Sequence, residues 1–310
     1  MRLRAIHTTH YVYPFPVRQS HNELRLMPLS DDDQACLDFR LTVAPSAPTF
    51  AYDLPTGRVH HFNHHAPHNE LTILAESLVV TYRHNPFDGL QLLENDRRFY
   101  AQDRIRQDYA EYLMPTERVP LIPEADRIAG VALKQTGGST ASFLIGLTRV
   151  LYRVCQYRPG ATHVNTTLTQ FLENNAGVCQ DFAHLMLAVC RRQGIPARYV
   201  SGYLYTGEKS EPEADADMQN HTRTLVGGDA MHAWVECLLP DERWHGFDPT
   251  NNILTNDYYV KVHYGRDYGD VPPVRGLYRG ATATTLAVSV RVSKDTLETN
   301  PEPHRGEYKR

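Results

Sequence analysis

The sequence contains little cysteine, and its cysteines are not arranged to organise a fold. Only five are present in 310 residues, and the two nearest in sequence, Cys179 and Cys190, are still far apart. This spacing excludes a CxxC metal knuckle and does not fit a disulfide framework. We therefore expect reduced thiols, a cytoplasmic protein, and neither a cofactor nor a structural metal.

Long apolar runs and an excess of basic charge are also missing. No stretch approaches the ~18 apolar residues that a membrane span requires, and the basic start lacks the ~7–15 apolar residues of a signal peptide. Lys and Arg number 32 against 36 Asp and Glu, a net charge of −4, whereas a dedicated nucleic-acid binder needs a basic surface. We expect no membrane or nucleic-acid partner, and the sequence leaves the oligomeric state open.

The first third of the chain has the pattern of short β-strands. Period-2 runs at residues 7–13, 36–43, 59–62 and 71–81 are separated by turn formers, which is typical of a small antiparallel domain. Residues 84–136 are rich in proline and charge around one possible helix at 98–113. We interpret that stretch as a connection.

The remainder of the chain alternates predicted helices and strands. Apolar residues recur at helical spacing over 143–154, a second short helix is expected at 168–174, and the clearest helix is expected at 178–193. Strands are then expected at residues 198–205, 233–239, 243–247 and 286–292. The polar stretch at 206–230 is either a lid or a solvated insertion, and residues 294–310 form a charged tail.

Cys179 stands in the first turn of the clearest predicted helix, directly after Gly177 and Val178. Unpaired backbone amides and the helix dipole at this position favour a thiolate over a thiol. Its spacing from Phe182 and Met186 directs the sulfur along the apolar face of the helix, toward the expected sheet. The other cysteines of this region, Cys155, Cys190 and Cys237, are more simply explained as small core residues.

His232 begins a predicted strand. Residues 240–242 then form a turn that leads into a second strand ending at Asp248. A hairpin centred on Pro240 places Asp248 directly opposite His232, within reach of a hydrogen bond. A thiolate, an imidazole and a carboxylate are the groups needed for acyl transfer: the first attacks a carbonyl, the second moves the proton, and the third orients the ring. Cys179, His232 and Asp248 are therefore the predicted catalytic residues. For the oxyanion, the Cys179 amide needs a second donor, with Tyr157 and Gln180 as weak candidates.

At these positions the sequence resembles the transglutaminase-like core. The resemblance lies in four linked motifs: residues 177–183 read GVCQDFA, 194–203 read GIPARYVSGY, 232–236 read HAWVE, and 247–250 read FDPT. Segments at 265–276 and the HxTxYxY pattern from His7 resemble the bacterial members, so the likeness covers about residues 1–90 and 140–292. Met231 departs from the family pattern, where a small or hydroxyl residue is more usual.

The resemblance implies an α+β protein: a papain-like, transglutaminase-like core, with a Cys-bearing helix packed on an antiparallel sheet, preceded by a small all-β domain. We divide the chain into an N-terminal β domain at 1–90, a connection at 91–138, the core at 139–293 and a flexible tail at 294–310. The family's catalytic Cys, His and Asp fall on Cys179, His232 and Asp248. The implied reaction is acyl transfer or amide hydrolysis on a peptide or protein substrate through a thioester.

Several alternatives stay open at this point. The site could belong to a cysteine peptidase or amidase, to a protein cross-linking transglutaminase, or to a non-catalytic protein that holds a peptide in the same cleft. The histidines at positions 60, 61, 64, 65 and 68 suggest a metal-dependent hydrolase, but alternation along a strand would split His60 and His64 from His61 and His65. Trp234 either borders the acyl site or fills the core.

Overall fold

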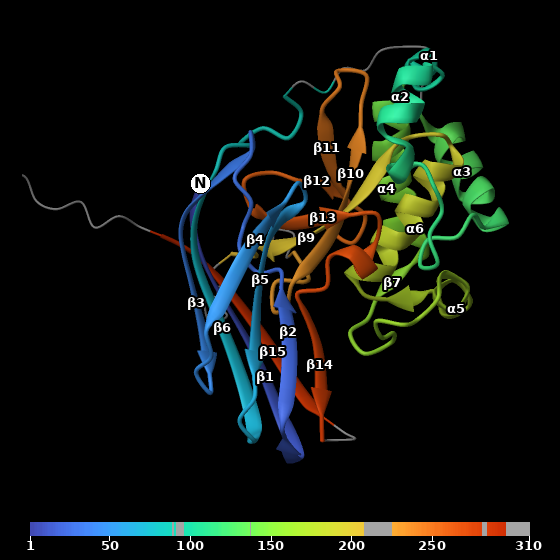
Figure 1. Ribbon diagram of the computed structural model, residues 1–310. Coiled ribbons are helices and arrows are strands. Elements are labelled where there is room, and N and C mark those ends of the chain that lie inside the picture. The colour runs from blue at the N-terminus through green and yellow to red at the C-terminus, as the bar shows by residue number, and fades with distance from the viewer. Residues whose placement is uncertain (89, 91–95, 137, 208–224, 281–283, 296–310) are drawn as a thin grey trace, which may run out of the picture.

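The N-terminal part of the protein is a β-sandwich. In this computed structural model, residues 1–88, 90, 96–136, 138–207, 225–280 and 284–295 are described. Two antiparallel four-stranded sheets have the orders β15-β1-β6-β3 and β14-β2-β5-β4 (Figure 1). Their strands are β1 (Arg2–Val17), β2 (Gln19–Leu24), β3 (Gln34–Ala44), β4 (Thr49–Leu54), β5 (Gly57–His64), β6 (His68–Thr81), β14 (Val274–Arg279) and β15 (Thr285–Lys294).

The four strands predicted in this region are confirmed, whereas β2 and β4 were missed. The two sheets enclose a core that includes Tyr13, Leu24, Phe62 and Ile73, which are the inward residues of the alternating pattern. The edge strand β4 is exposed along its whole length, so no buried face marks it in the sequence. Strands β14 and β15 pair with β2 and β1, which means that part of the predicted 139–293 core returns to the sandwich.

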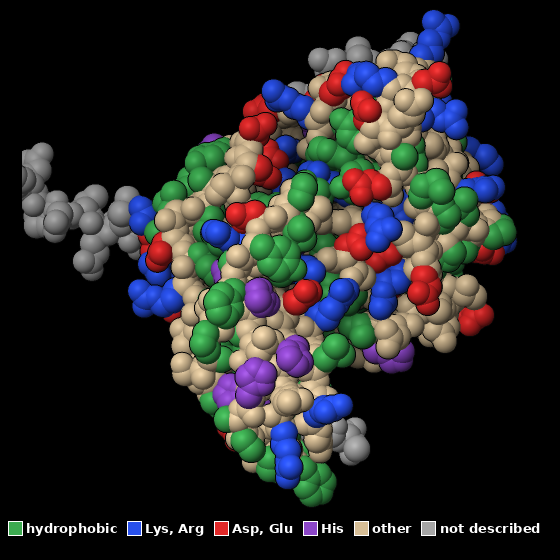
Figure 2. Space-filling model, in the orientation of Figure 1, with side chains coloured by type: hydrophobic (Ala, Val, Ile, Leu, Met, Phe, Trp, Pro, Cys, Tyr) green, Lys and Arg blue, Asp and Glu red, His purple; other side chains and the backbone are tan. Residues whose placement is uncertain are grey.

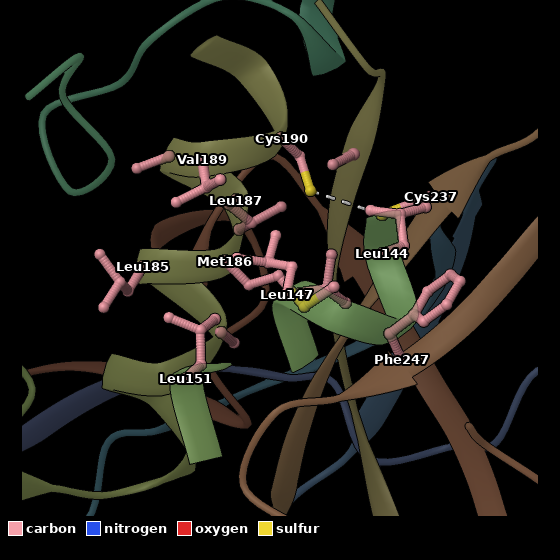
Figure 3. Close-up of a cluster of buried hydrophobic side chains, with 14 of the residues drawn as sticks. Leu144, Leu147, Leu151, Leu185, Met186, Leu187, Val189, Cys190, Cys237 and Phe247 are labelled. Carbon is pink, nitrogen blue, oxygen red and sulfur yellow. Dashed lines mark hydrogen bonds between the residues drawn. The ribbon is translucent and has the colours of Figure 1, made fainter. Parts of the chain in front are cut away.

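The second half is a five-stranded antiparallel sheet, ordered β12-β11-β10-β9-β13, covered on one side by helices. The core there includes Leu144, Leu147, Met186, Val235 and Phe247, seen in part in Figure 3. Its elements are α3 (Pro123–Gln135), α4 (Thr140–Val154), β7 (Gln156–Tyr157), α5 (Leu168–Asn174), β8 (Ala176–Gly177), α6 (Cys179–Arg192), β9 (Ala197–Leu204), β10 (His232–Leu238), β11 (Trp244–Asp248), β12 (Ile253–Leu254), β13 (Tyr259–Gly265) and the 3-10 turn η2 (Tyr268–Asp270). The helix-on-sheet core predicted from the family resemblance is confirmed.

Helix α6 packs its apolar side on β9 and β10. It begins where the Val178 backbone N–H donates to Asp181, and it ends at Arg192, two residues before Gly194, whose φ of +72° favours glycine. Toward its C-terminal end, the Cys190 sulfur lies 3.7 Å from that of Cys237 on β10 (Figure 3). Both thiols are fully buried, as expected for core residues.

The connection between the two halves differs from the prediction in two ways. The single helix expected at 98–113 is wrong: it is broken into α1 (Arg97–Tyr100), α2 (Asp103–Asp108) and the 3-10 turn η1 (Ala110–Tyr112). The break occurs because Gln102 is extended, with ψ of 132°. Helix α3 was missed because its stretch was interpreted as a proline-rich connection, whereas proline at the first helical position is compatible with a helix.

The face of the five-stranded sheet opposite the helices packs against the sandwich. Tyr203 and Val260 of the sheet share a buried cluster with Leu3, Ala5 and Val79 of the sandwich, which explains why β9 is buried on both faces. No described helix is long and apolar enough to cross a membrane. The predicted loop at 206–230 and tail at 294–310 lie largely outside the described residues.

Candidate active site

Cys179 is the first residue of α6 and is half-buried. As the first helical residue, its N–H precedes the helical hydrogen-bond ladder and stays available for a ligand or substrate atom. Its side chain interacts with the imidazole of His232 and contributes to raising the pKa of that ring. The first turn of α6 therefore brings the predicted nucleophile to the predicted base.

His232 and Asp248 form a buried hydrogen-bonded pair. The His232 Nε2 lies 2.8 Å from Asp248 Oδ2, and neither side chain is exposed. This bond uses one ring nitrogen, so Nδ1 is the nitrogen left for Cys179, and it has no hydrogen-bond partner among the described residues. The predicted pairing of His232 with Asp248 is thus present, while its catalytic role stays a prediction.

The predicted register of this hairpin is wrong by two residues. Val235 pairs with Phe247, and on continuing this register Asp248 stands across from Trp234 and diagonal to His232. A shift of two residues in partner keeps every side chain on its face, whereas a shift of one would have separated the pair. Diagonal neighbours remain within reach of long side chains.

The error arises in the turn. Leu239 and Arg243 close a three-residue loop with a 3.0 Å bond from the Leu239 N–H to the Arg243 carbonyl, so the hairpin is centred on Asp241 and not on Pro240. Glu242 takes a φ of +59°, as the last residue of such a loop commonly does.

Asp248 is held by more donors than the sequence analysis found. Its Oδ1 accepts the backbone N–H groups of Thr250 (2.8 Å) and Asn251 (3.1 Å). Its Oδ2 also accepts the Asn251 side-chain amide and the Tyr259 hydroxyl, each at 2.7 Å. The short Asp-Pro-Thr-Asn sequence could have suggested the Asn251 contacts, since such turns bond back to the leading carboxylate. No local pattern marks Tyr259, which comes from β13.

The electrostatics favour an ion pair between the two residues. Burial alone would lower the pKa of His232, but the charge of Asp248 and its hydrogen bond, with smaller effects of Cys179, raise it to about 10. Burial alone would raise the pKa of Asp248, but His232 and the bonds from Asn251 and Tyr259 lower it. His232 is therefore an imidazolium at neutral pH, which stabilises a thiolate next to it.

A loop rests against the imidazole and fixes one side of the site. A Cβ atom on Gly227 would lie 2.4 Å from His232 Nδ1, and the Gly227 φ is +95°, so only glycine fits. The preceding Val226 exchanges two hydrogen bonds with the Asn251 side chain, at 2.9 and 3.2 Å. Asn251 thus joins this loop to Asp248.

Three further residues that the sequence predicts near the site, Tyr157, Gln180 and Trp234, have different surroundings. Tyr157 is half-buried, and burial together with the charges of Cys179, Asp229 and Asp248 raises its pKa to about 12. Gln180 is buried and donates to the Val164 carbonyl at 3.4 Å. The Trp234 ring lies 5.2 Å from that of Tyr259 and 6.4 Å from that of His232 in a buried cluster.

Cys179 is expected to be the thiol that iodoacetamide labels first at neutral pH. Cys36 is equally half-buried, but burial and the neighbouring Asp38 raise the pKa of Cys36 to about 11, whereas Cys179 faces an imidazolium. Because the thiolate is the reactive form, we expect labelling of Cys179 to be about tenfold faster or more. Peptide mass spectrometry of a labelling time course measures both rates in one sample.

The matched variant for this measurement is His232→Ala, which should slow the labelling of Cys179 and leave that of Cys36 unchanged. Equal rates at the two cysteines would contradict the prediction. If the labelling rate of Cys179 is unchanged in His232→Ala, the imidazole does not activate this thiol.

The histidine side chains of residues 60–68 do not come together at one point. His61 packs against Phe50, at 5.5 Å between ring centroids, while His64 packs against His68 at 4.5 Å. Figure 2 shows histidine side chains on the exposed surface of the sandwich. Across the described part of the chain, no group of three or more His, Cys, Asp or Glu side chains is placed to hold a metal ion.

Comparison with known proteins agrees with this architecture. A family described as "Transglutaminase-like superfamily" matches residues 130–249, and a "Bacterial transglutaminase-like N-terminal region" matches residues 3–80. An uncharacterized protein of Mycobacterium leprae is 34% identical over 295 residues, which is 94% of this chain and 99% of that one. A protein-glutamine gamma-glutamyltransferase of Pseudomonas aeruginosa is 32% identical over 96 residues, 31% of this chain and 13% of that one.

The chain belongs to the transglutaminase-like superfamily and carries the N-terminal region of its bacterial members. The crystal structure of a "Putative Cysteine Protease" from Cytophaga hutchinsonii aligns with it at a TM-score of 0.70 and 20% sequence identity, covering 98% of this chain and 93% of that one. This likeness shows that the two share the fold. The residues 179, 232 and 248 all lie within the matched core.

Proposed function

We propose that this protein is a thiol enzyme that breaks amide bonds of a peptide or protein substrate through a thioester on Cys179, most simply as a cysteine peptidase or amidase. The observation that carries the proposal is the 2.8 Å bond of the buried His232 to Asp248, on a ring whose other nitrogen is left for Cys179. Superfamily members are usually enzymes of this kind, which adds support. A protein that only holds a peptide has no need of the three groups together.

The chemistry follows from the charges. The Cys179 thiolate attacks the carbonyl carbon, and the resulting tetrahedral intermediate collapses as the His232 imidazolium gives its proton to the leaving amine. Water then attacks the thioester while His232 accepts a proton, and the acid is released. Asp248 remains ionised and keeps the ring in one orientation throughout.

The oxyanion of the tetrahedral intermediate requires donors. The Cys179 N–H at the start of α6 supplies one. Tyr157 lies near enough to Cys179 for the charge of that thiolate to act on its hydroxyl, and a phenol hydroxyl can donate, so we take Tyr157 as the second donor. Gln180 uses one of its two amide N–H groups to donate to the Val164 carbonyl, which leaves the other for the oxyanion as the alternative donor.

A second candidate reaction, in which an amine and not water accepts the acyl group, is supported by one comparison. The partial similarity to a protein-glutamine gamma-glutamyltransferase suggests that a primary amine could replace water in the second step, which would make the protein a cross-linking enzyme. The two candidates share the first half of the reaction and differ only in what attacks the thioester.

The experiment is to trap the acyl group. The protein is incubated with peptides from a cell extract, quenched in acid and digested, and mass spectrometry identifies any group attached to Cys179. Parallel samples contain ¹⁸O-labelled water or a fluorescent alkylamine, so that incorporation into product distinguishes hydrolysis from amine transfer. The Cys36→Ala variant is carried through as the matched control.

We expect an acyl adduct on Cys179 in the parent and in Cys36→Ala, with ¹⁸O in the released carboxylate. Amine incorporation in place of ¹⁸O would select the cross-linking reaction. The absence of any adduct on Cys179 in all samples would refute the proposed function.

A further inference from the structure

A single carboxylate oxygen joins the start of α6 to a separate loop. Asp181 is 2% exposed. Its Oδ2 accepts the Val178 backbone N–H at 2.8 Å and the Thr162 hydroxyl at 2.6 Å. Capping of a helix by its own third residue explains the first bond. It does not explain the second, which comes from outside the helix.

The backbone next to Cys179 is shaped to receive this carboxylate. A Cβ atom on Gly177 would lie 2.4 Å from Asp181 Oδ2, so glycine is needed for the contact. The Gly177 carbonyl accepts the Arg158 N–H at 2.8 Å, and Gly177 pairs with Tyr157 in the parallel β7–β8 bridge. Asp181 therefore contacts both residues that precede Cys179: it accepts the N–H of Val178 and packs closely against Gly177.

The loop that Thr162 belongs to, residues 158–167, directly follows Tyr157 and lies over the start of α6. Two further side chains hold it through the Val164 carbonyl: Gln180 at 3.4 Å and Arg118. The guanidinium of Arg118 also lies over the Tyr268 ring, 5.7 Å from its centroid. Of these anchors, Asp181 is the one that also bonds to the residue before Cys179.

We infer that Asp181 is a positioning residue: through Thr162 it fixes the 158–167 loop, and with it Tyr157, relative to the Cys179 amide. This inference rests on the proposed function for the reaction that it assists. A role in capping alone would need only the bond from Val178. The bond from Thr162 instead ties the loop that follows Tyr157 to the first turn of α6.

Two reagents separate this role from a general effect on the thiol. Acylation by p-nitrophenyl acetate forms a bond from the Cys179 sulfur to the acetyl carbon and expels p-nitrophenolate, through an oxyanion that needs both donors. Alkylation by iodoacetamide displaces iodide at a saturated carbon and forms no oxyanion. The ratio of the two rates at Cys179 therefore reports the arrangement of the donors.

The test variant is Thr162→Val, which removes the hydroxyl and keeps the shape. We expect its acylation burst to slow by about tenfold or more, since small misplacements of reacting groups are costly, while its alkylation rate stays within about twofold. Thr162→Ser, which retains a hydroxyl, should restore the acylation rate. Asp181→Ala should lower it further, and Asp181→Asn should lower it less, because one amide oxygen can accept both bonds.

The matched control is Thr148→Val, which removes another threonine hydroxyl, bonded at 2.8 Å to the Leu144 carbonyl within α4. It should leave the ratio unchanged. An unchanged ratio in Thr162→Val, with a normal burst in the parent, would overturn the positioning role and leave the proposed function standing. The absence of any burst in the parent would count against the proposed function itself.

Discussion

Cys179→Ala is expected to abolish turnover, with a loss of at least about a thousandfold in kcat/KM, because it removes the sulfur that forms the proposed thioester. Substrate binding should change little, since the substitution removes only one sulfur atom from a half-buried position. The measurement is the rate of product release from a substrate identified by acyl trapping. Binding of the same peptide is followed by calorimetry.

The matched control is Cys36→Ala, a thiol of similar exposure in β3 of the sandwich. It should retain the parent rate. A Cys179→Ala protein that turns over substrate like the parent would contradict the enzyme proposal. If it also binds the peptide like the parent, the non-catalytic peptide-binding alternative becomes the better explanation.

The elements that carry the candidate site could be predicted from sequence because each has a strong local signal. The apolar spacing of residues 143–154 and 178–193 matches α4 and α6 to within a few residues. Cys179 is placed at a helix start by Gly177 before it and the helical pattern after it. His232 and Asp248 share a face because strands alternate strictly, and this held although the register differed by two.

The support around these residues could not be predicted, because it depends on tertiary contacts that leave no local pattern in the sequence. Tyr259 reaches Asp248 from β13, and Gly227 approaches His232 from the loop before β10. The return of β14 and β15 to the sandwich is another such case, since their pairing with β2 and β1 spans almost the whole chain and leaves no local pattern. Long-range contacts of this kind decide domain boundaries.

The largest expected effect on stability is that of Asp248→Ala. Removing one partner of a buried ion pair leaves an uncompensated charge and costs about 3–5 kcal/mol of unfolding free energy. His232 loses its fully buried partner at 2.8 Å, and the hydroxyl of Tyr259 and the amide of Asn251 lose their acceptor as well. Urea unfolding of the parent and the variant at neutral pH measures this difference.

The comparison variant, Asp248→Asn, separates stability from catalysis. Its carbonyl oxygen can still accept hydrogen bonds, so the loss of stability should be smaller than for alanine. The loss of kcat should still be large, about 10³- to 10⁴-fold, because the ring is no longer held as an imidazolium in one orientation. A stable Asp248→Asn protein with the parent kcat would remove Asp248 from the proposed mechanism.

The same pair predicts how the cost of Asp248→Ala changes with pH. The pKa of His232 is raised from 6.5 to about 10 by Asp248, against the opposing effect of burial. The stabilisation that protonated His232 supplies is therefore fully present below about pH 6.5 and is lost as the pH rises through about 10. The pKa of Asp248 is lowered from 3.8 by His232 and its hydrogen bonds, again against burial, so its contribution disappears as the pH falls below that value.

Unfolding free energies should therefore differ most between parent and variant from weakly acidic to neutral pH and converge toward both extremes. A difference that does not depend on pH would mean that His232 and Asp248 are not an ion pair in the folded protein.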